Sequence, residues 1–487
     1  MRRTTVFVSV VRPDFYAQWR ARNEARLLLR EAGSPQPPER VLQSVWLHQR
    51  LLRDQLRLLD GRPLRVLHPG FWNKEAGPDF RGAVIQIADD PPRSGDVEID
   101  LVASNWRAHR HQDNPAYANV ILHVLWSADA GASPDRPALA LENALDSPIA
   151  ELHSWADSPS AATWPDHVQG VCSAPLRELS AEQSLELLNQ AGLSRLQRKA
   201  RELEIRARHA GWEQALWEGL FRALGYKQNV WPMQRLSELR GLLCADCAAP
   251  VPLQARLLGV AGLLPGDDSD RQFNPFVRTL WDHWWRDRER FADGLLPKTL
   301  WRFNGLRPAN QPQRRLALAA HWLGAADLFD RLEAWFAAEN AGPPEDSLLA
   351  CLQPPLDDYW SWHWGLSTER LPKPQPLLGQ SRATDLAVNV VLPWFHARAR
   401  AGCNAALERR AEAKYLAWPA AQDNAVLRLA RQRLFGQPAP RWLNTAAAQQ
   451  GLLQIVRDFC QHTNALCADC LFPEMAKELL LKNNDPE

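Results

Sequence analysis

Acidic residues between positions 79 and 100 form the densest group of chemically active side chains in this sequence. Asp79 stands where a turn enters a predicted strand, and Glu98 and Asp100 lie two positions apart on the next strand. Because side chains alternate across a strand, Glu98 and Asp100 share one face of the sheet. If the two strands pair, the three carboxylates converge, and oxygen-rich sites of this kind suit Mg²⁺ or Mn²⁺. We therefore predict Asp79 and Glu98 as ligands of a divalent ion that activates water against a phosphodiester.

Three histidines follow these acids in the chain. His109 and His111 come after a tryptophan in a loop or short helix, where general acid–base chemistry or phosphate contact is plausible. His123 alternates with Ile121 along a predicted strand, so it is either an accessory site residue or part of a packed sheet. A second interpretation makes these histidines transition-metal ligands of another kind of hydrolase.

The order of these elements resembles the PD-(D/E)XK nuclease pattern, in which Pro-Asp begins a strand and Glu-x-Lys lies on the next. Pro78-Asp79 and Glu98-Ile99-Asp100 match it, with 18 residues between Asp79 and Glu98. The resemblance implies a nuclease-like fold and a magnesium-dependent activity. The alternative is that these acidic residues have no catalytic role and simply lie at a strand edge and on a solvated face.

Two further residues belong to this comparison with nucleases. Glu39, at the start of the preceding predicted helix, is in position to supply the accessory acid that such nucleases often carry. Asp100 stands where the pattern has lysine, the residue that orients and deprotonates the attacking water. Some nucleases of this type use an acid or glutamine there, and Lys74, five residues before Asp79, is the other candidate.

Longer segments are similar to a bacterial family catalogued as domain of unknown function 2851. They are LHPGFWNKEAGPDFRGAVIQI, GDVEIDLVASNWRAHRHQDNPAYANVILHVLW, LLGVAGLLP and RPANQPQRRLA. The resemblance runs from about Glu39 to the C-terminal cysteines. It implies a shared architecture and leaves the activity open.

The elements that must position these residues change character along the chain. Short β-rich runs bounded by Pro, Gly, Asp and Asn are found at 64–70, 81–88, 95–103, 119–126 and 137–142. After about residue 175 the apolar spacing becomes helical, and capping boxes start at Ser180 and Ser194. We predict an α+β protein: an N-terminal extension (1–38), a small mixed-sheet nuclease-like domain (39–170) and a large all-α domain (171–487).

Cysteines near the C-terminus suggest a second metal site. Cys460, Cys467 and Cys470 include a CxxC motif, and we predict that they bind zinc or an iron–sulfur cluster together with Cys403. His462 is an alternative fourth ligand. A second CxxC motif, Cys244 and Cys247, allows a site made from both motifs. Buried cysteines without metal are the ordinary alternative.

Basic clusters in the helical part are candidates for binding a phosphate backbone. They comprise Arg195, Arg198 and Lys199 on one predicted helix, and Arg314 and Arg315 on another. Solvated helix faces have much the same composition. The whole chain, with 57 basic and 56 acidic residues, has a net charge of +1, so any binding of DNA or RNA requires such a local patch.

Composition excludes several classes of protein. An apolar fraction of 46% and a charged fraction of 23% are typical of globular chains. No apolar stretch approaches the roughly 18 residues of a membrane helix, and the short N-terminal apolar run lacks a cleavage site, so we expect a cytoplasmic protein. Dinucleotide-binding, P-loop and nucleophile-elbow motifs are missing from the sequence.

The sequence therefore favours a metal-dependent nuclease acting on DNA or RNA. Asp79 and Glu98 would bind the metal, and Asp100 or Lys74 would orient and deprotonate the attacking water. His109 or His111 would lie near the scissile phosphate. A catalytically inactive nuclease-like protein that binds nucleic acid or supports assembly is the first alternative. A metallohydrolase acting on another substrate is the second.

Overall fold

Contacts divide the chain into two compact units, each assembled from separated stretches. The computed structural model describes residues 11–31, 36–73, 75–128, 136–149, 152, 169–266, 274–339, 342–436, 440, 442–460, 467 and 470–481. Unit 1 takes its described residues from 1–44, 149–204 and 391–487, and unit 2 from 45–148 and 205–390. The units do not follow the consecutive ranges expected from the sequence, because the chain passes between them within α2 (Glu39–His48) and α6 (Ala181–Ala210).

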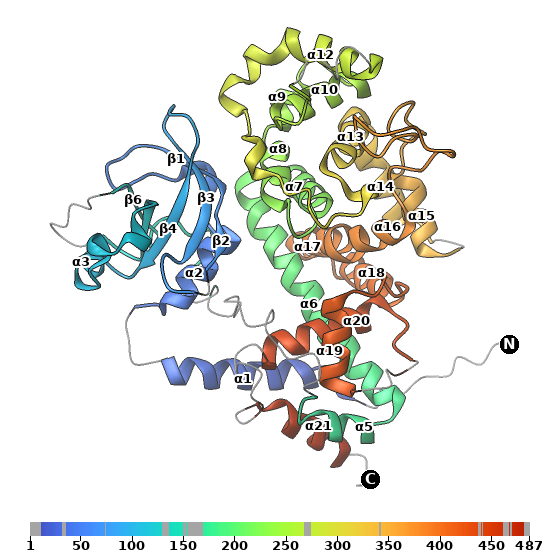
Figure 1. The fold of residues 1–487 in the computed structure, drawn as a ribbon. Helices are drawn as coiled ribbons and strands as arrows, with labels where there is room; N and C mark the ends of the chain where they lie inside the picture. The colour runs from blue at the N-terminus through green and yellow to red at the C-terminus, as the bar shows by residue number, and fades with distance from the viewer. Residues whose placement is uncertain are drawn as a thin grey trace. The chain divides into compact units, whose positions relative to one another are not determined.

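Unit 2 contains a mixed six-stranded sheet (Figure 1). Its strands are β1 (Leu64–His68), β2 (Phe71–Trp72), β3 (Phe80–Ile87), β4 (Arg93–Asp100), β5 (Val120–Leu125) and β6 (Ala138–Ala140). They are ordered β1-β3-β4-β5-β6, and β2 pairs with the start of β3. The pairs β1–β3 and β3–β4 are antiparallel, whereas β4–β5 and β5–β6 are parallel. The start of β3 therefore lies at the same end of the sheet as the last residues of β4 and β5.

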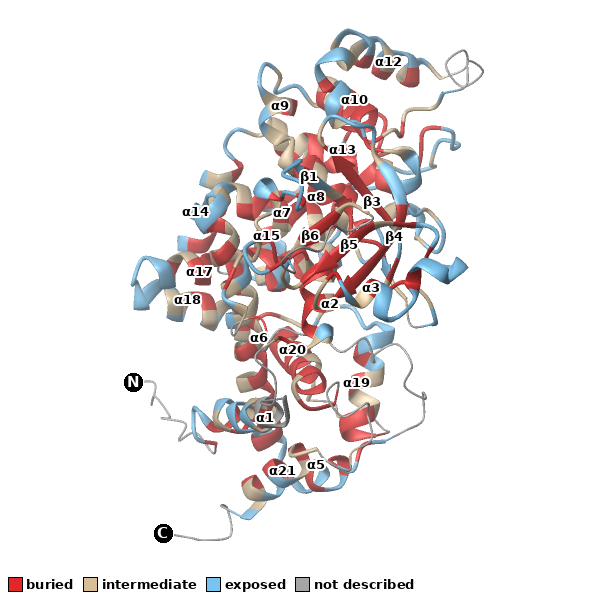
Figure 2. Cartoon of the chain, turned by 90° about the vertical axis from the view of Figure 1, so that its left-hand side faces the viewer, coloured by how far each residue is buried: buried red, intermediate tan, exposed pale blue. Residues whose placement is uncertain are grey.

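The alternation predicted for β4 is present in the structure. Val97 and Ile99 are fully buried on one face and pack with Leu122 and Val124 of β5, which are their register partners. Glu98 and Asp100 point to the other face. Figure 2 shows that the strands are buried along most of their length, so these two acids lie in a largely covered sheet.

The connection from β4 to β5 contains only short helical turns: α3 (Asn105–Ala108), η2 (His111–Asp113) and η3 (Pro115–Tyr117). Among the described residues, the remaining helices of unit 2 are η1 (Arg53–Gln55), α7 (Trp212–Leu224), α8 (Val230–Glu238), α9 (Arg240–Cys244), α10 (Pro250–Val260), α12 (Pro275–Asp287), η5 (Arg288–Gly294), η6 (Lys298–Leu300), η7 (Pro308–Asn310), α13 (Pro312–Gly324), α14 (Leu328–Ala337), α15 (Pro344–Leu352) and α16 (Gln380–Leu386). Helix α8 packs on β1, so the sheet and the helices form one body.

The regular elements of unit 1 within its described residues are all helices. It contains α1 (Phe15–Glu31), α5 (Ser173–Glu178), α17 (Leu392–Ala401), α18 (Ala405–Leu416), α19 (Ala425–Phe435), α20 (Ala446–Ile455), the π-helical turn η9 (Val456–Cys460) and α21 (Phe472–Leu481). A second π-helical turn, η8 (Ala387–Val391), precedes α17. Helix α5 packs against both α19 and α21.

The fold class predicted from the sequence is confirmed: a small mixed sheet precedes a long, mainly helical region, which makes an α+β protein. None of the helices that the structure describes has the length and apolar character needed to cross a membrane.

Candidate metal centre

Pairing of β3 with β4 brings Asp79 and Glu98 together. Phe80, the first residue of β3, pairs with Val97, which places Asp79 beside the next residues of β4. The backbone N–H of Asp79 donates to Glu98 Oε2 at 3.0 Å, and the N–H of Ile99 donates to Asp79 Oδ2 at 3.1 Å. These two bonds hold both carboxylates at one end of the β3–β4 pair.

A side chain that sequence reasoning missed, Asn73, shapes the loop before Asp79. Its Nδ2 donates to the carbonyl oxygens of Glu75 (3.0 Å) and Pro78 (2.9 Å), and its Oδ1 accepts from the N–H of Glu75 at 3.1 Å. Its own N–H donates to the carbonyl of Asp79 at 2.7 Å. Asparagine commonly closes turns in this way, so its position within this loop was the available signal. Lys74 lies outside the described residues.

Glu98 and Asp100 are buried carboxylates, 7% and 2% exposed. In the parallel pairing with β5, Glu98 is opposite His123. His123, itself 3% exposed, places Nε2 2.9 Å from Asp100 Oδ2. The predicted alternatives for His123 are therefore both satisfied in part, since it is packed within the sheet and also bonded to a candidate site residue.

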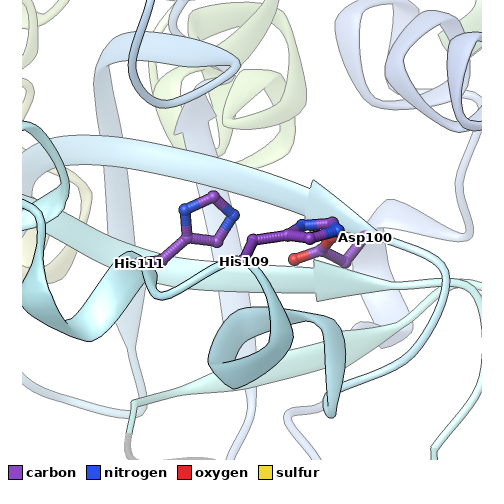
Figure 3. Close-up of side chains that lie close together, drawn as sticks. All are labelled: Asp100, His109 and His111. Carbon is purple, nitrogen blue, oxygen red and sulfur yellow. Dashed lines mark ion pairs between the residues drawn. The ribbon is translucent and has the colours of Figure 1, made fainter.

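His109 and His111 approach the same carboxylates from the β4–β5 connection. Arg110 adopts a left-handed conformation (φ 56°), which separates the short helix α3 from η2. His109 Nδ1 is 3.8 Å from Asp100 Oδ1, and His111 Nε2 is 3.4 Å from Glu98 Oε1. Asp100, His109 and His111 each offer one ligand atom, and these atoms lie within 4.8 Å of one another (Figure 3).

Aromatic side chains hold the imidazole rings in place. Tyr117 stacks on His111 with ring centroids 3.9 Å apart. Trp106 meets the rings of His111 and His123 edge-on, each at 5.2 Å between centroids, and the guanidinium of Arg136 lies 4.4 Å from the Trp106 ring centroid. Trp106 and Tyr117 form a small apolar cluster with Val120. Sequence reasoning missed both aromatic residues, because a tryptophan or tyrosine in a short connection has no distinctive spacing.

The electrostatics of His111 favour a neutral ring. Burial lowers the pKa of His111, and neighbouring His109 and His123 lower it further, against the opposing effect of Asp100. Nε2 of His111 is buried and makes no hydrogen bond to any described residue. A buried, neutral imidazole nitrogen directed at carboxylates is suited to a metal ion. His109, whose side chain is 54% exposed, leaves one side of the cluster open to solvent.

The remaining sequence-predicted residues are not part of this cluster. Glu39 is an exposed first residue of α2, and its Oε1 accepts a hydrogen bond from Gln43 at 3.3 Å. Arg195 and Lys199 both donate to Gln450 Oε1, at 2.6 Å and 3.0 Å. Arg198 pairs with Glu202 at 3.2 Å on the same helix.

Arg314 and Arg315 correct the prediction of a nucleic-acid contact at those positions. They are 1% and 4% exposed, and they donate mainly to main-chain carbonyls, Arg314 to His363 at 3.0 Å and Arg315 to Leu377 at 2.7 Å. Burial, followed by the charge of Arg315, lowers the pKa of Arg314 to about 10. Both guanidinium groups organise a loop inside unit 2, so neither is available to a phosphate backbone.

Among the cysteines, the structure changes the set predicted from the sequence. Cys403 is exposed in the turn between α17 and α18. Cys460 is buried, and Cys467 and Cys470 are half-buried. His462 lies outside the described residues. Cys244 and Cys247 belong to unit 2, whereas the C-terminal cysteines belong to unit 1.

Together, fold and site define an α+β protein with a carboxylate–imidazole cluster at one end of a mixed sheet. The chain belongs to the family described as "Protein of unknown function (DUF2851)", whose model matches residues 39–423. The matched range contains the whole cluster from Asp79 to His123 and ends before Cys460. No match was found among curated proteins or among solved structures.

Proposed function

We propose that this protein is a metal-dependent nuclease that hydrolyses phosphodiester bonds of DNA or RNA at the cluster on β3, β4 and the β4–β5 connection. The observation that carries the proposal is that two sets of possible metal ligands lie next to each other. Asp100, His109 and His111 offer ligand atoms within 4.8 Å of one another, and His111 lies 3.4 Å from Glu98, which is hydrogen-bonded to Asp79.

The donor set fits a divalent transition metal better than magnesium. Imidazole nitrogen suits Zn²⁺ and related ions, whereas Mg²⁺ prefers oxygen ligands alone. His111 Nε2, buried without a hydrogen bond in the described chain, is the atom whose environment a metal would complete. The hydrogen bond from His123 to Asp100 is the outer contact that fixes a ligating carboxylate. The ion, when bound, supplies an acidified water and stabilises phosphoryl charge.

The chain's own residues would orient that chemistry. Glu98 is held by the N–H of Asp79 on one oxygen and faces His111 with the other, so it is positioned as a proton acceptor beside the metal ligands. Asp100, the residue at the lysine position of the nuclease pattern, then serves as a metal ligand and not as the base.

Residues next to Asp79 suit a nucleic acid strand. Phe71 is 45% exposed and pairs with Arg81 in the β2–β3 ladder, two positions from Asp79. The guanidinium of Arg302 lies 5.0 Å from the Phe71 ring centroid. An exposed aromatic ring beside two arginines offers a stacking surface for a base and positive charge for a phosphate.

A metallohydrolase acting on another substrate is the second candidate. Two histidines and one carboxylate are also the type of ligand set found in zinc hydrolases that act on peptides and related bonds. This candidate needs the same metal centre and differs only in substrate.

Metal binding is the first test. Calorimetric titration of the purified full chain with Mn²⁺ and with Zn²⁺ should show saturable binding. Asp100→Asn and His111→Asn should weaken it by about tenfold or more, since each removes a ligand. Asp113→Asn is the matched control, because Asp113 is an exposed acid two residues from His111. Equal affinity in all variants would exclude the cluster as the metal site.

Activity is the second test. Plasmid, single-stranded DNA and RNA are incubated with the metal-loaded chain, and cleavage should be lost in Asp79→Asn and Glu98→Gln but kept in Asp113→Asn. Metal binding without cleavage of any nucleic acid contradicts the nuclease and supports the second candidate. Cleavage that survives in both Asp79→Asn and Glu98→Gln contradicts the roles proposed for Asp79 and Glu98.

A further inference from the structure

Four cysteines from three separate segments lie together in unit 1. Cys172 directly precedes α5, Cys460 ends η9, and Cys467 and Cys470 lie just before α21. Cys172 and Cys460 are 4% and 5% exposed within one apolar cluster, and Cys470 packs against it. Cys467, three residues before Cys470, contacts the buried Arg433.

The helices that follow these cysteines explain why the segments meet. Helix α5 packs against α21 and α19, and Figures 1 and 2 both show α5 beside α21. Cys172 and Cys470 are therefore placed at the entrances of two neighbouring helices. The N–H of Cys470 donates to the carbonyl of Cys467 at 3.2 Å.

A buried arginine lies among the sulfurs. Arg433 of α19 is 2% exposed, and its Nη2 donates to Cys467 Sγ at 3.1 Å. The Arg433 carbonyl accepts from the N–H of Gly170, and a Cβ added at Gly170 would meet that carbonyl at 3.0 Å and Cys172 Sγ at 3.1 Å. Arg433 thus contacts Cys467 and the segment that precedes Cys172.

This environment suits ionised sulfur. Hydrogen bonds to a charged acceptor are roughly twice as strong as those to a neutral one, so a guanidinium gains most from a thiolate. A metal ion deprotonates the thiols that bind it, so the ligating sulfurs would carry the negative charge that the Arg433 guanidinium stabilises.

We propose that Cys172, Cys460, Cys467 and Cys470 together bind one metal centre, either Zn²⁺ or an iron–sulfur cluster, that ties α5 to η9 and α21. Four cysteine thiolates are the ligand set of both. Cys172 takes the place that the sequence suggested for Cys403. The site shares no residue with the carboxylate–imidazole cluster, so its test does not depend on the proposed nuclease activity.

Elemental analysis and visible spectroscopy of the full chain, purified without oxygen, distinguish the two kinds of centre. We expect about one zinc per chain and no colour, or about four iron with broad visible absorption. Cys172→Ser and Cys467→Ser should each lose most of this metal. Cys403→Ser, the matched exposed control, should keep it. Metal retained by Cys172→Ser and lost by Cys403→Ser would overturn the assignment.

Thiol titration of the wild-type chain covers the case in which a cysteine variant does not fold. In the native protein, four thiols should be protected from an aromatic disulfide reagent and become reactive when a chelator removes the metal. A chain that holds neither zinc nor iron, as isolated and after reconstitution with each under reducing conditions, contradicts the proposal.

Discussion

Buried histidines give this protein much of its expected response to pH. His111 is kept neutral among carboxylates by its burial. His68, at the end of β1, is 5% exposed, and its Nδ1 accepts a hydrogen bond from the N–H of Gly70 at 2.9 Å. Burial, with a smaller effect from the charge of Arg302, lowers the pKa of His68 to about 4. Protonation of the buried His68 ring therefore destabilises the folded structure.

The first prediction concerns this pH dependence. Because the folded pKa of His68 lies below its unfolded value of about 6.5, the unfolded chain takes up the proton first as the pH falls. The contribution of the neutral His68 ring to the free energy of unfolding is complete above about pH 6.5. It decreases by about 1.4 kcal/mol per pH unit as the pH falls towards 4. Urea unfolding of His68→Gln should show a shallower pH slope in this range.

His209→Gln is the matched control, since His209 is exposed in the last turn of α6. Its slope should equal that of the wild type. If His68→Gln also has the wild-type slope, His68 does not titrate differently in the two states.

Residue spacing also explains which site residues could be predicted. The i, i+2 pair Glu98 and Asp100 had to share a face of any strand, and the structure brings Asp79 to Glu98 as expected. Arg314 and Arg315 look like a basic surface in the sequence, yet both are buried. Their hydrogen bonds reach carbonyls about 50 to 60 positions further along, at His363 and Leu377, and no local pattern specifies such partners.

At the scale of elements, close approach of β4 and β5 depends on a glycine. A Cβ at Gly95 would lie 2.4 Å from Cγ2 of Ile121 and 2.7 Å from the carbonyl oxygen of Asn119. Asp96, the next residue, donates its N–H to that same carbonyl at 2.8 Å. Any side chain at position 95 therefore pushes apart the two strands that carry Glu98 and His123.

The second prediction follows from this contact. Gly95→Ala should destabilise the protein by about 1–3 kcal/mol, the usual cost of overpacking, and should weaken metal binding at the cluster. Gly241→Ala is the control, because a Cβ there, in helix α9, meets nothing within 4 Å. That change should leave stability equal or raise it by about 0.5–1 kcal/mol. Equal destabilisation by both substitutions would contradict the argument.

Local signals predicted several elements well. The Ser180 capping box is confirmed, since the N–H of Gln183 donates to Ser180 Oγ at 3.2 Å and Ser180 N–H donates to Gln183 Oε1 at 2.8 Å. Helix α13 runs from Pro312 to Gly324, with proline at its first position and glycine at its end, as is common for helices. Caps and breakers act within a few residues, whereas the two units combine distant stretches, so their composition could not be derived from local patterns.

At the scale of the whole molecule, unit 2 joins its early and late segments through a buried ion cluster. Glu218 of α7 is 4% exposed, and its Oε2 is 2.8 Å from Nη2 of Arg53, next to the sheet. Arg206 reaches the other oxygen at 2.8 Å, and Arg53 also pairs with Glu238 at 3.0 Å. Burial raises the pKa of Glu218, but Arg206 and Arg53 outweigh it and lower the pKa overall.

The third prediction is that Glu218→Gln destabilises unit 2 by about 3 kcal/mol, because it leaves two half-buried guanidinium groups short of a charge. The loss should shrink as the pH falls below the unfolded pKa of about 4.3, because the unfolded carboxylate then takes up a proton before the folded one, whose pKa is lower. Urea unfolding at pH 7 and at several pH values below about 4.3 measures both effects. Glu289→Gln, an acid whose side chain is 91% exposed, should change stability by less than about 0.5 kcal/mol. A similar small change for Glu218→Gln would contradict this role.

The crossover between the two parallel strands has a consequence for how the molecule assembles. The connection between these strands contains His109 and His111, so the docking of β5 on β4 restrains the segment that brings the imidazoles to Asp100. An unfolded chain does not hold these side chains together, so an ion bound at the proposed metal centre would favour the docked strands. Added metal should therefore slow amide hydrogen exchange in this region. The slowed amides should lie in the β4–β5 connection and in both strands.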